Sequence, residues 1–374
     1  MSWETIIGQS RVKSLLQRIL ESRHIGHAYL FYGPEGIGKD ALAIEFAKTL
    51  NCTSGTVEAC GNCPSCQKMT ALQHPDLRLV YPLPAGKGEK TGDDPLEVLT
   101  ESQVAEVREQ IKLKASDPYY HIEIPKANTI KINSIRNIKR ESSMSRVEEG
   151  WKIFLILDAD AMNAEAGNSL LKILEEPLPR TLLLLTSSSK DRLLPTIVSR
   201  CQLIQCDRLS EDEIDTALRI RYGAEPSLAH LAAQLAGGSY RAARRLISQD
   251  IRDERIEIVK FMRLVLGKQK APLLDFVEEL LSSDRTAVER WLKLLGSWIR
   301  DAFLLSKHVQ VALLEEDTKD LASFVEKYGQ ADFPAALRTV EQAIAHLDKN
   351  VYLYLLLINL ALQLRKDMEQ PALL

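Results

Sequence analysis

A complete G-x-x-x-x-G-K loop occupies residues 33–39, between two segments of different periodicity. The apolar run 28–32 before it predicts a short buried strand, and residues 41–50 after it predict a helix. In that order, the loop's N–H groups and the helix N-terminus attract phosphate, and the lysine meets the outer phosphates. The motif predicts a P-loop nucleotide site on an α/β sheet, with these candidate residues: Gly33, Gly36, Gly38, Lys39 and Asp40.

Two positions that P-loop enzymes use for hydrolysis carry other residues in this chain. Position 40, usually a Ser or Thr whose hydroxyl coordinates Mg²⁺, is Asp40. The apolar run 153–157 leads into Asp158, which can hold Mg²⁺, but the next residue is Ala159, where many ATPases place the Glu that orients water. Each loss removes a different part of the machinery, so we expect no ATP hydrolysis by the chain alone. Two alternatives stay open: ATP or ADP still binds, or the loop keeps its shape and holds nothing.

The rest of the chain divides into an α/β part and a helical part. Apolar runs at 153–157 and 182–185, with a weaker one at 203–204, predict further parallel strands. Helical periodicity is predicted at 12–22, 101–113, 132–140 and 164–174. After about residue 208 only helical patterns remain, and Ser210 with Glu213 predicts the capping box of the first helix there. We expect an α/β domain at 1–207, a small helical domain at 208–250 and a larger one at 251–374.

Four cysteines lie close together in the pattern C-x7-C-x2-C-x2-C. Four thiolates at this spacing suit a tetrahedral Zn²⁺ that has no open coordination position, and an iron–sulfur cluster is the rival interpretation. Cys201 and Cys206 lie elsewhere and are predicted to be buried thiols. The predicted structural zinc ligands are Cys52, Cys60, Cys63 and Cys66.

Composition limits the class of protein and its partners. The formal net charge is −3, so no overall positive field attracts nucleic acid, and any DNA contact must come from a local patch or from partners. The N-terminus has no signal-peptide pattern, and the apolar run 351–364 is too short to span a bilayer. We expect a cytoplasmic protein without membrane contact. The loop 82–95, rich in Pro, Gly and charge, predicts an insertion, and residues 82–130 match no motif.

Two stretches resemble the clamp-loader subunits of bacterial DNA polymerase III, which are AAA+ proteins. One runs from Asp158 to Pro177 and the other from Leu194 to Gln202, and Ile7-Gly8-Gln9 and His27 to Phe31 fit the same family. The altered positions 40 and 159, together with an intact Ser-Arg-Cys at 199–201, are closer to the delta prime type than to the gamma/tau type. The resemblance covers residues 1–210. An active gamma/tau-type ATPase is the alternative.

The resemblance implies a place for this chain in a hetero-pentameric ring. Its partners would be gamma/tau-like and delta-like subunits, and the ring would load a sliding clamp onto primer-template DNA as part of the DNA polymerase III holoenzyme. The resemblance further implies a helical lid at 208–250 and an oligomerisation domain at 251–374. It implies a trans arginine finger at Arg200, a sensor 1 residue at Ser187 or Ser188, and a sensor 2 residue at Arg241. An ion pair of Arg200 within its own domain is the competing interpretation.

One basic helix is a candidate DNA contact. Arg136, Lys139 and Arg140 share a face at i, i+3 and i+4, with Lys131 nearby. A DNA-facing surface and an ordinary solvated face explain this pattern equally well. A P-loop kinase is a third functional class, but no phosphoryl-acceptor site is evident and Ser199-Arg200-Cys201 would have no purpose in it.

Overall fold

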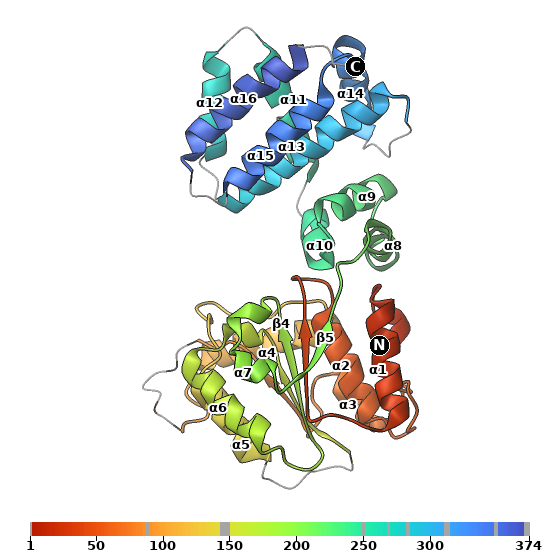
Figure 1. Cartoon of the computed structure of the whole chain (residues 1–374), viewed down its shortest axis with the longest axis vertical. Coiled ribbons are helices and arrows are strands. Elements are labelled where there is room, and N and C mark those ends of the chain that lie inside the picture. The colour runs from red at the N-terminus through yellow and green to blue at the C-terminus, as the bar shows by residue number, and fades with distance from the viewer. Residues whose placement is uncertain are drawn as a thin grey trace. The chain divides into compact units, whose positions relative to one another are not determined.

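The computed structural model describes residues 2–84, 86, 90, 92–142, 150–248, 251–267, 270–281, 285–309, 315–347 and 351–369. The chain divides into two compact units (Figure 1). The first comprises Met1–Ile214 and Gly238–Ala242, and the second Asp215–Gly237 and Ala243–Leu374.

The first unit is built around a five-stranded parallel sheet with the order β2-β3-β4-β1-β5. Its central strands are buried along their length, as expected where helices cover both faces of a parallel sheet. The strands are β1 Ala28–Tyr32, β2 Leu77–Val80, β3 Lys152–Ile156, β4 Thr181–Ser187 and β5 Gln202–Gln205.

Helices cover both faces of this sheet (Figure 1). The helices of the first unit are α1 Ser10–Ser22, α2 Lys39–Leu50, α3 Pro64–Thr70, α4 Glu101–Ser116, α5 Ile132–Ser142, α6 Ala164–Glu175 and α7 Pro195–Val198. On one face Tyr29 of β1 meets Phe46 of α2, with ring centroids 5.3 Å apart. On the other face α5 and α6 bury Ile135, Ile138 and Leu170 against β1, β3 and β4. This two-sided core fixes the ends of the strands, where the candidate nucleotide residues lie.

The predicted α/β class is confirmed: a parallel sheet carries the P-loop, and helices follow it. In the first unit the edge strand β2 and the short helices α3 and α7 were not predicted. The described part of the predicted loop 82–95 contains no helix or strand, and residues 85, 87–89 and 91 lie outside the described residues.

The remaining helices are α8 Glu211–Tyr222, α9 Pro226–Leu235, α10 Tyr240–Ser248, α11 Ile251–Leu266, α12 Ala271–Leu281, α13 Arg285–Ser306, α14 Glu315–Tyr328, α15 Phe333–Leu347 and α16 Leu353–Glu369. Ser210 and Glu213 form the expected capping box, each side chain bonding the other's backbone N–H at 3.2 and 2.9 Å. In the second unit α13 packs against α11, α14 and α15. Within the described residues no helix combines the length and apolar content that a membrane span requires.

Candidate functional sites

The parallel sheet brings the separate nucleotide-binding candidates to one edge. β1, β3 and β4 are parallel neighbours, so the loops after their carboxyl ends lie together. The P-loop follows β1, Asp158 follows β3 and Ser188 follows β4. All of them line one small cavity of about 40 Å³, together with Arg241.

The P-loop lysine is bound to its own loop. Lys39 Nζ donates to the carbonyl oxygens of Gly33 and Pro34 at 2.9 and 2.7 Å, and to Ser188 Oγ at 3.2 Å. Burial lowers the pKa of Lys39, and the nearby carboxylate of Asp40 opposes that shift. The structure thus brings Ser188 of the predicted pair to the lysine, while Ser187 is buried at the end of β4.

Asp40 forms an ion pair that the sequence did not reveal. Its Oδ2 lies 2.5 Å from Lys114 Nζ at the end of α4, and only 1% of the Lys114 side chain is exposed. Burial alone would raise the pKa of Asp40, but Lys114, Lys39 and a hydrogen bond from Thr186 together lower it. The carboxylate at this position is therefore neutralised by an ammonium group of the same chain.

Asp158 lies at the same edge of the sheet, where its surroundings disfavour the charged form of its carboxyl group. Burial and the neighbouring carboxylates of Asp40 and Asp160 raise its pKa to about 7. His121 Nδ1 lies 3.6 Å from Asp158 Oδ2. Asp160 accepts a hydrogen bond from the Ser188 backbone at 3.3 Å, and Ala159 is fully buried. No carboxylate stands at position 159 to orient a water molecule.

Arg241 is held against the P-loop by its own chain. Its backbone N–H donates to Gly36 O at 3.3 Å, and its guanidinium pairs with Glu35 at 2.7 Å. A Cβ added to Gly36 would lie 2.6 Å from Arg241 Cβ, so the glycine permits this close approach. Arg241, the predicted sensor 2 residue, lines the same cavity as Gly36 and Lys39 of the P-loop.

Sequence reasoning missed four cavity residues that follow α4, namely Pro118, Tyr119, Tyr120 and His121, and it missed Lys114, which pairs with Asp40. All of them come from the segment 82–130, which matched no motif. The sequence did predict a helix at 101–113. Nothing in that pattern indicated that the end of the helix reaches the P-loop, which lies more than seventy positions earlier in the chain.

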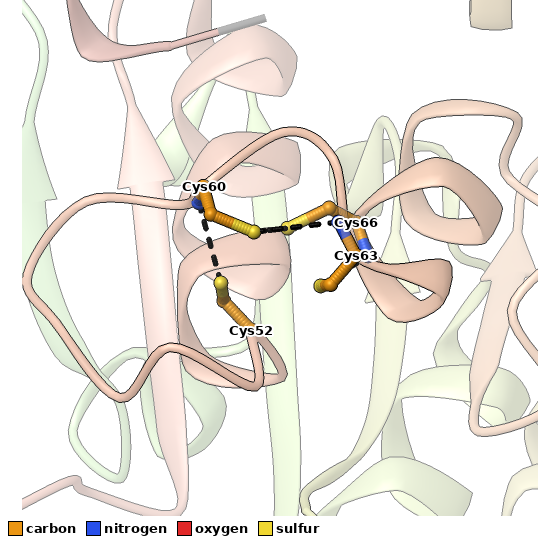
Figure 2. Close-up of side chains that lie close together, drawn as sticks. All are labelled: Cys52, Cys60, Cys63 and Cys66. Atoms are coloured by element: carbon orange, nitrogen blue, oxygen red, sulfur yellow. Dashed lines mark hydrogen bonds between the residues drawn. The ribbon is translucent and has the colours of Figure 1, made fainter.

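The four clustered cysteines converge on one point (Figure 2). Their sulfur atoms all lie within 4.8 Å of one another. Backbone N–H groups donate to these sulfurs: Cys60 to Cys52, Cys63 to Cys60 and Cys66 to Cys63, at 3.3 to 3.4 Å. Such donors stabilise thiolates, and four sulfurs at this spacing can surround one tetrahedral metal ion.

The electrostatics of this cluster favour ionised sulfur at one position in particular. Burial would raise the pKa of Cys63, but hydrogen bonds from Thr53 and the Cys66 amide outweigh it and lower that pKa to about 5. Cys63 is also the N-cap of α3, where the helix end favours negative charge. The predicted ligand set therefore fits a metal ion geometrically and chemically.

Arg200 follows α7 on the surface of the first unit. Its guanidinium pairs with Glu175 of α6 at 2.9 Å and donates to the Thr196 carbonyl at 3.1 Å. The Arg200 and Glu175 side chains are 37% and 50% exposed, and ion pairs this accessible contribute only about 0–1 kcal/mol. The internal ion pair is thus present but weak.

The basic face of α5 borders a cavity of about 500 Å³ next to α6. Arg136, Lys139 and Arg140 lie along it, joined by Lys172 of α6, and its floor includes Ile173 and Leu183. Lys131 is placed apart from this face, because its ammonium donates to the Pro84 carbonyl at 2.6 Å.

Comparison with known proteins identifies the family. The family model described as "DNA polymerase III, delta subunit" matches residues 8–210. A delta prime subunit of DNA polymerase III from Bacillus subtilis is 27% identical over 96% of both chains. The delta prime subunit of Pseudomonas aeruginosa is 34% identical over 66% of this chain and 63% of its own length.

Other relatives are more distant. The tau subunit of Bacillus subtilis is 27% identical over 67% of this chain, which spans 38% of that protein. Among solved structures, a gamma subunit-related protein of Thermotoga maritima covers 95% of this chain at 16% identity, with a TM-score of 0.40. Because the family model spans more than half of the residues, the chain belongs to the DNA polymerase III delta subunit family, with a delta prime subunit as a relative along nearly its whole length.

Proposed function

We propose that this chain is a delta prime-type subunit of the DNA polymerase III clamp loader that does not hydrolyse ATP itself. It joins gamma/tau-like and delta-like subunits in a five-membered ring, and the ring uses ATP to place a sliding clamp on primer-template DNA. The observation that carries the proposal is the accessible Arg200 on an intact Ser-Arg-Cys, in a chain that has Asp40 at the end of its P-loop and Ala159 after Asp158.

In this function Arg200 acts in the ATP site of a neighbouring subunit. Its planar guanidinium stabilises charge on the transferred phosphoryl group, which a lysine does poorly. Exchanging the weak bond to Glu175 for a phosphate contact costs little, because both side chains are already hydrated.

The experiment is an Arg200→Ala variant in the reconstituted ring. DNA-stimulated ATPase activity falls by about the share of one ATP site while assembly is unchanged, because a finger contributes on the order of 10³–10⁵ at its own site and the other ATP sites of the ring retain theirs. Arg200→Lys restores little of the loss.

Glu175→Gln is the matched control, because it breaks the same internal ion pair and leaves the guanidinium in place. If the ion pair were the purpose of Arg200, the two variants would lose stability alike and ATPase activity per assembled ring would stay normal. That result contradicts the proposal.

Two further parts of the chain have roles in this proposal. The cysteine module holds structural Zn²⁺, since four protein thiolates complete its tetrahedral shell and leave no position for a substrate. The exposed Arg136, Lys139 and Lys172 contact DNA phosphates within the assembled ring. Nucleotide is not needed for either role.

Assembly is assigned to the helices of 251–374. Leu355 and Leu362, seven positions apart on α16, are 63% and 61% exposed, and Tyr352 just before the helix is equally accessible. Residues at this spacing share one helix face, and a row of exposed apolar side chains fits a subunit contact.

A further inference from the structure

Residues 100–121 form a well-defined segment that the proposed function does not use. Thr100 and Gln103 make a capping box that starts α4, with Thr100 N donating to Gln103 Oε1 at 2.9 Å. The helix then runs to Ser116, and the chain turns back so that Tyr120 N bonds Asp117 O at 2.8 Å. This geometry places the end of α4, and the turn that follows it, beside the P-loop.

Lys114 places a positive charge where a P-loop metal stands. In a working P-loop the residue after the lysine coordinates Mg²⁺, and here that residue is Asp40. Lys114 Nζ donates to Asp40 Oδ2 at 2.5 Å and to the Tyr120 carbonyl at 2.6 Å, and its side chain is almost completely buried. The same ammonium also acts on Asp158, the second acidic residue of the site.

Tyr119 covers the backbone of the loop. A Cβ added to Gly38 would lie 2.8 Å from the Tyr119 ring, so the ring rests against the glycine at the start of α2. Tyr119 Oη accepts a hydrogen bond from Ile7 N at 2.7 Å, and the ring packs edge-on against Tyr240 at 5.0 Å. The cavity that remains, about 40 Å³, is far below the roughly 300 Å³ or more of small-molecule sites.

We propose that residues 100–121 of the same chain fill the nucleotide-binding position beside the P-loop. The Lys114 ammonium replaces Mg²⁺, and the Tyr119 ring blocks the position that a nucleotide would take. Mg²⁺ would have to displace the Lys114 ammonium from the Asp40 carboxylate, which is 20% exposed, and leave the buried ammonium without its counter-charge. This inference rests on the proposed absence of hydrolysis and names the residues that exclude the substrate.

The first test is binding of Mg²⁺ and a fluorescent ADP analogue to the full chain. The wild-type chain gives no measurable binding. The triple variant Asp40→Thr, Lys114→Ala, Tyr119→Ala binds at least about a hundredfold more tightly, and addition of Lys39→Ala abolishes that gain. Wild-type binding as tight as that of the triple variant overturns the inference, as does a folded triple variant that still fails to bind.

The second test does not depend on recovering a nucleotide site. Asp40→Asn lowers Tm markedly, because it leaves the buried Lys114 ammonium without its counter-charge. Lys114→Met also lowers Tm, because it removes the ammonium from the partly buried Asp40 carboxylate, while the double variant recovers much of the loss. Lys112→Met is the matched control on the same helix, since its pair with Glu109 is 3.8 Å long and exposed, and it leaves Tm nearly unchanged. Strictly additive losses in the double variant rule out the proposed pairing.

The tests of the arginine finger and of the filled P-loop are independent of each other. Nucleotide binding by the wild-type chain overturns the internal occupant but leaves the Arg200 experiment unaffected. A normal ATPase rate in the Arg200→Ala ring overturns the arginine finger and does not change what occupies the P-loop.

Discussion

At the scale of single residues, the six cysteines occupy two kinds of surroundings. Cys52, Cys60 and Cys63 receive hydrogen bonds from backbone N–H groups, which favour the thiolate that a metal ion requires, whereas burial raises the pKa of Cys66. Cys201 and Cys206 are buried, as predicted, and burial raises the pKa of each to about 12. The six cysteine thiols are therefore expected to differ in reactivity, because hydrogen bonding and burial differ between the two groups.

Cys201 and Cys206 are expected to resist alkylation in the folded protein. Only the thiolate reacts, and a pKa raised to about 12 leaves roughly one thiol in ten thousand ionised at pH 8, a fraction that grows as pH rises. Mass spectrometry after labelling with N-ethylmaleimide at pH 8 should find both unmodified, and both modified after unfolding in guanidinium. Rapid native labelling of either residue would contradict this.

At the scale of elements, the cysteine module (residues 52–66) connects α2 to α3 through a loop whose residues bury little apolar surface. Cys63 caps α3, and Ser65 Oγ bonds the Asn51 carbonyl at 2.7 Å. Most residues between 53 and 61 are exposed, so the sulfurs are the main groups that can order this loop. Structural zinc contributes roughly 10 kcal/mol or more in small modules.

Removal of the metal should loosen this element and leave the sheet intact. Purified chain is expected to carry about one Zn²⁺, and Cys63→Ser to carry much less. Hydrogen exchange after chelation should speed up at the amides of Cys60, Cys63 and Cys66, with β3 unchanged. Elemental analysis that finds iron, or zinc undiminished in the variant, would refute the zinc assignment.

In the helical unit a buried ion pair joins α11 to α13. Arg255 and Asp301 lie 3.0 Å apart, and their side chains are 2% and 7% exposed. Asp301→Asn should lower the free energy of unfolding by about 3–5 kcal/mol, because it leaves a buried guanidinium without its counter-charge.

The matched control is the exposed pair of Arg263 and Asp320, at 2.7 Å. Asp320→Asn is expected to change the free energy of unfolding by about 0–1 kcal/mol, since water already solvates both groups. Urea denaturation of the two variants measures the difference. Equal small changes would mean that the buried pair is not a source of stability.

At the scale of the whole molecule, assembly with partner subunits should depend on the exposed face of α16. Leu355→Glu together with Leu362→Glu places charge on that face without touching a buried core. The variant is expected to remain folded and zinc-loaded, and to lose co-elution with gamma/tau-like and delta-like subunits in size-exclusion chromatography. Ile220→Glu, on an exposed site of α8, is the control. Unimpaired assembly of the α16 variant would refute the assignment.

The sequence by itself determined those elements and motifs that depend on residues close together in the chain. Continuous apolar runs predicted β1, β3 and β4, because buried parallel strands need such runs, and a weaker apolar pair at 203–204 predicted the edge strand β5. The spacing of the glycines and the lysine predicted the P-loop, and the spacing of the cysteines predicted the four-cysteine cluster, because each depends on residues close together in the sequence. Because parallel strands end at one edge of the sheet, Asp158 and Ser188 line the same small cavity as Lys39.

The tertiary structure alone decided the contacts between distant positions. β2 is a four-residue edge strand without an apolar run, and it forms because β3 offers it a partner. Lys114 and Asp40 are 74 positions apart, and neither signals the other in the sequence. A buried charge becomes favourable only when folding removes water and supplies its counter-charge, and that condition exists in three dimensions and not along the chain.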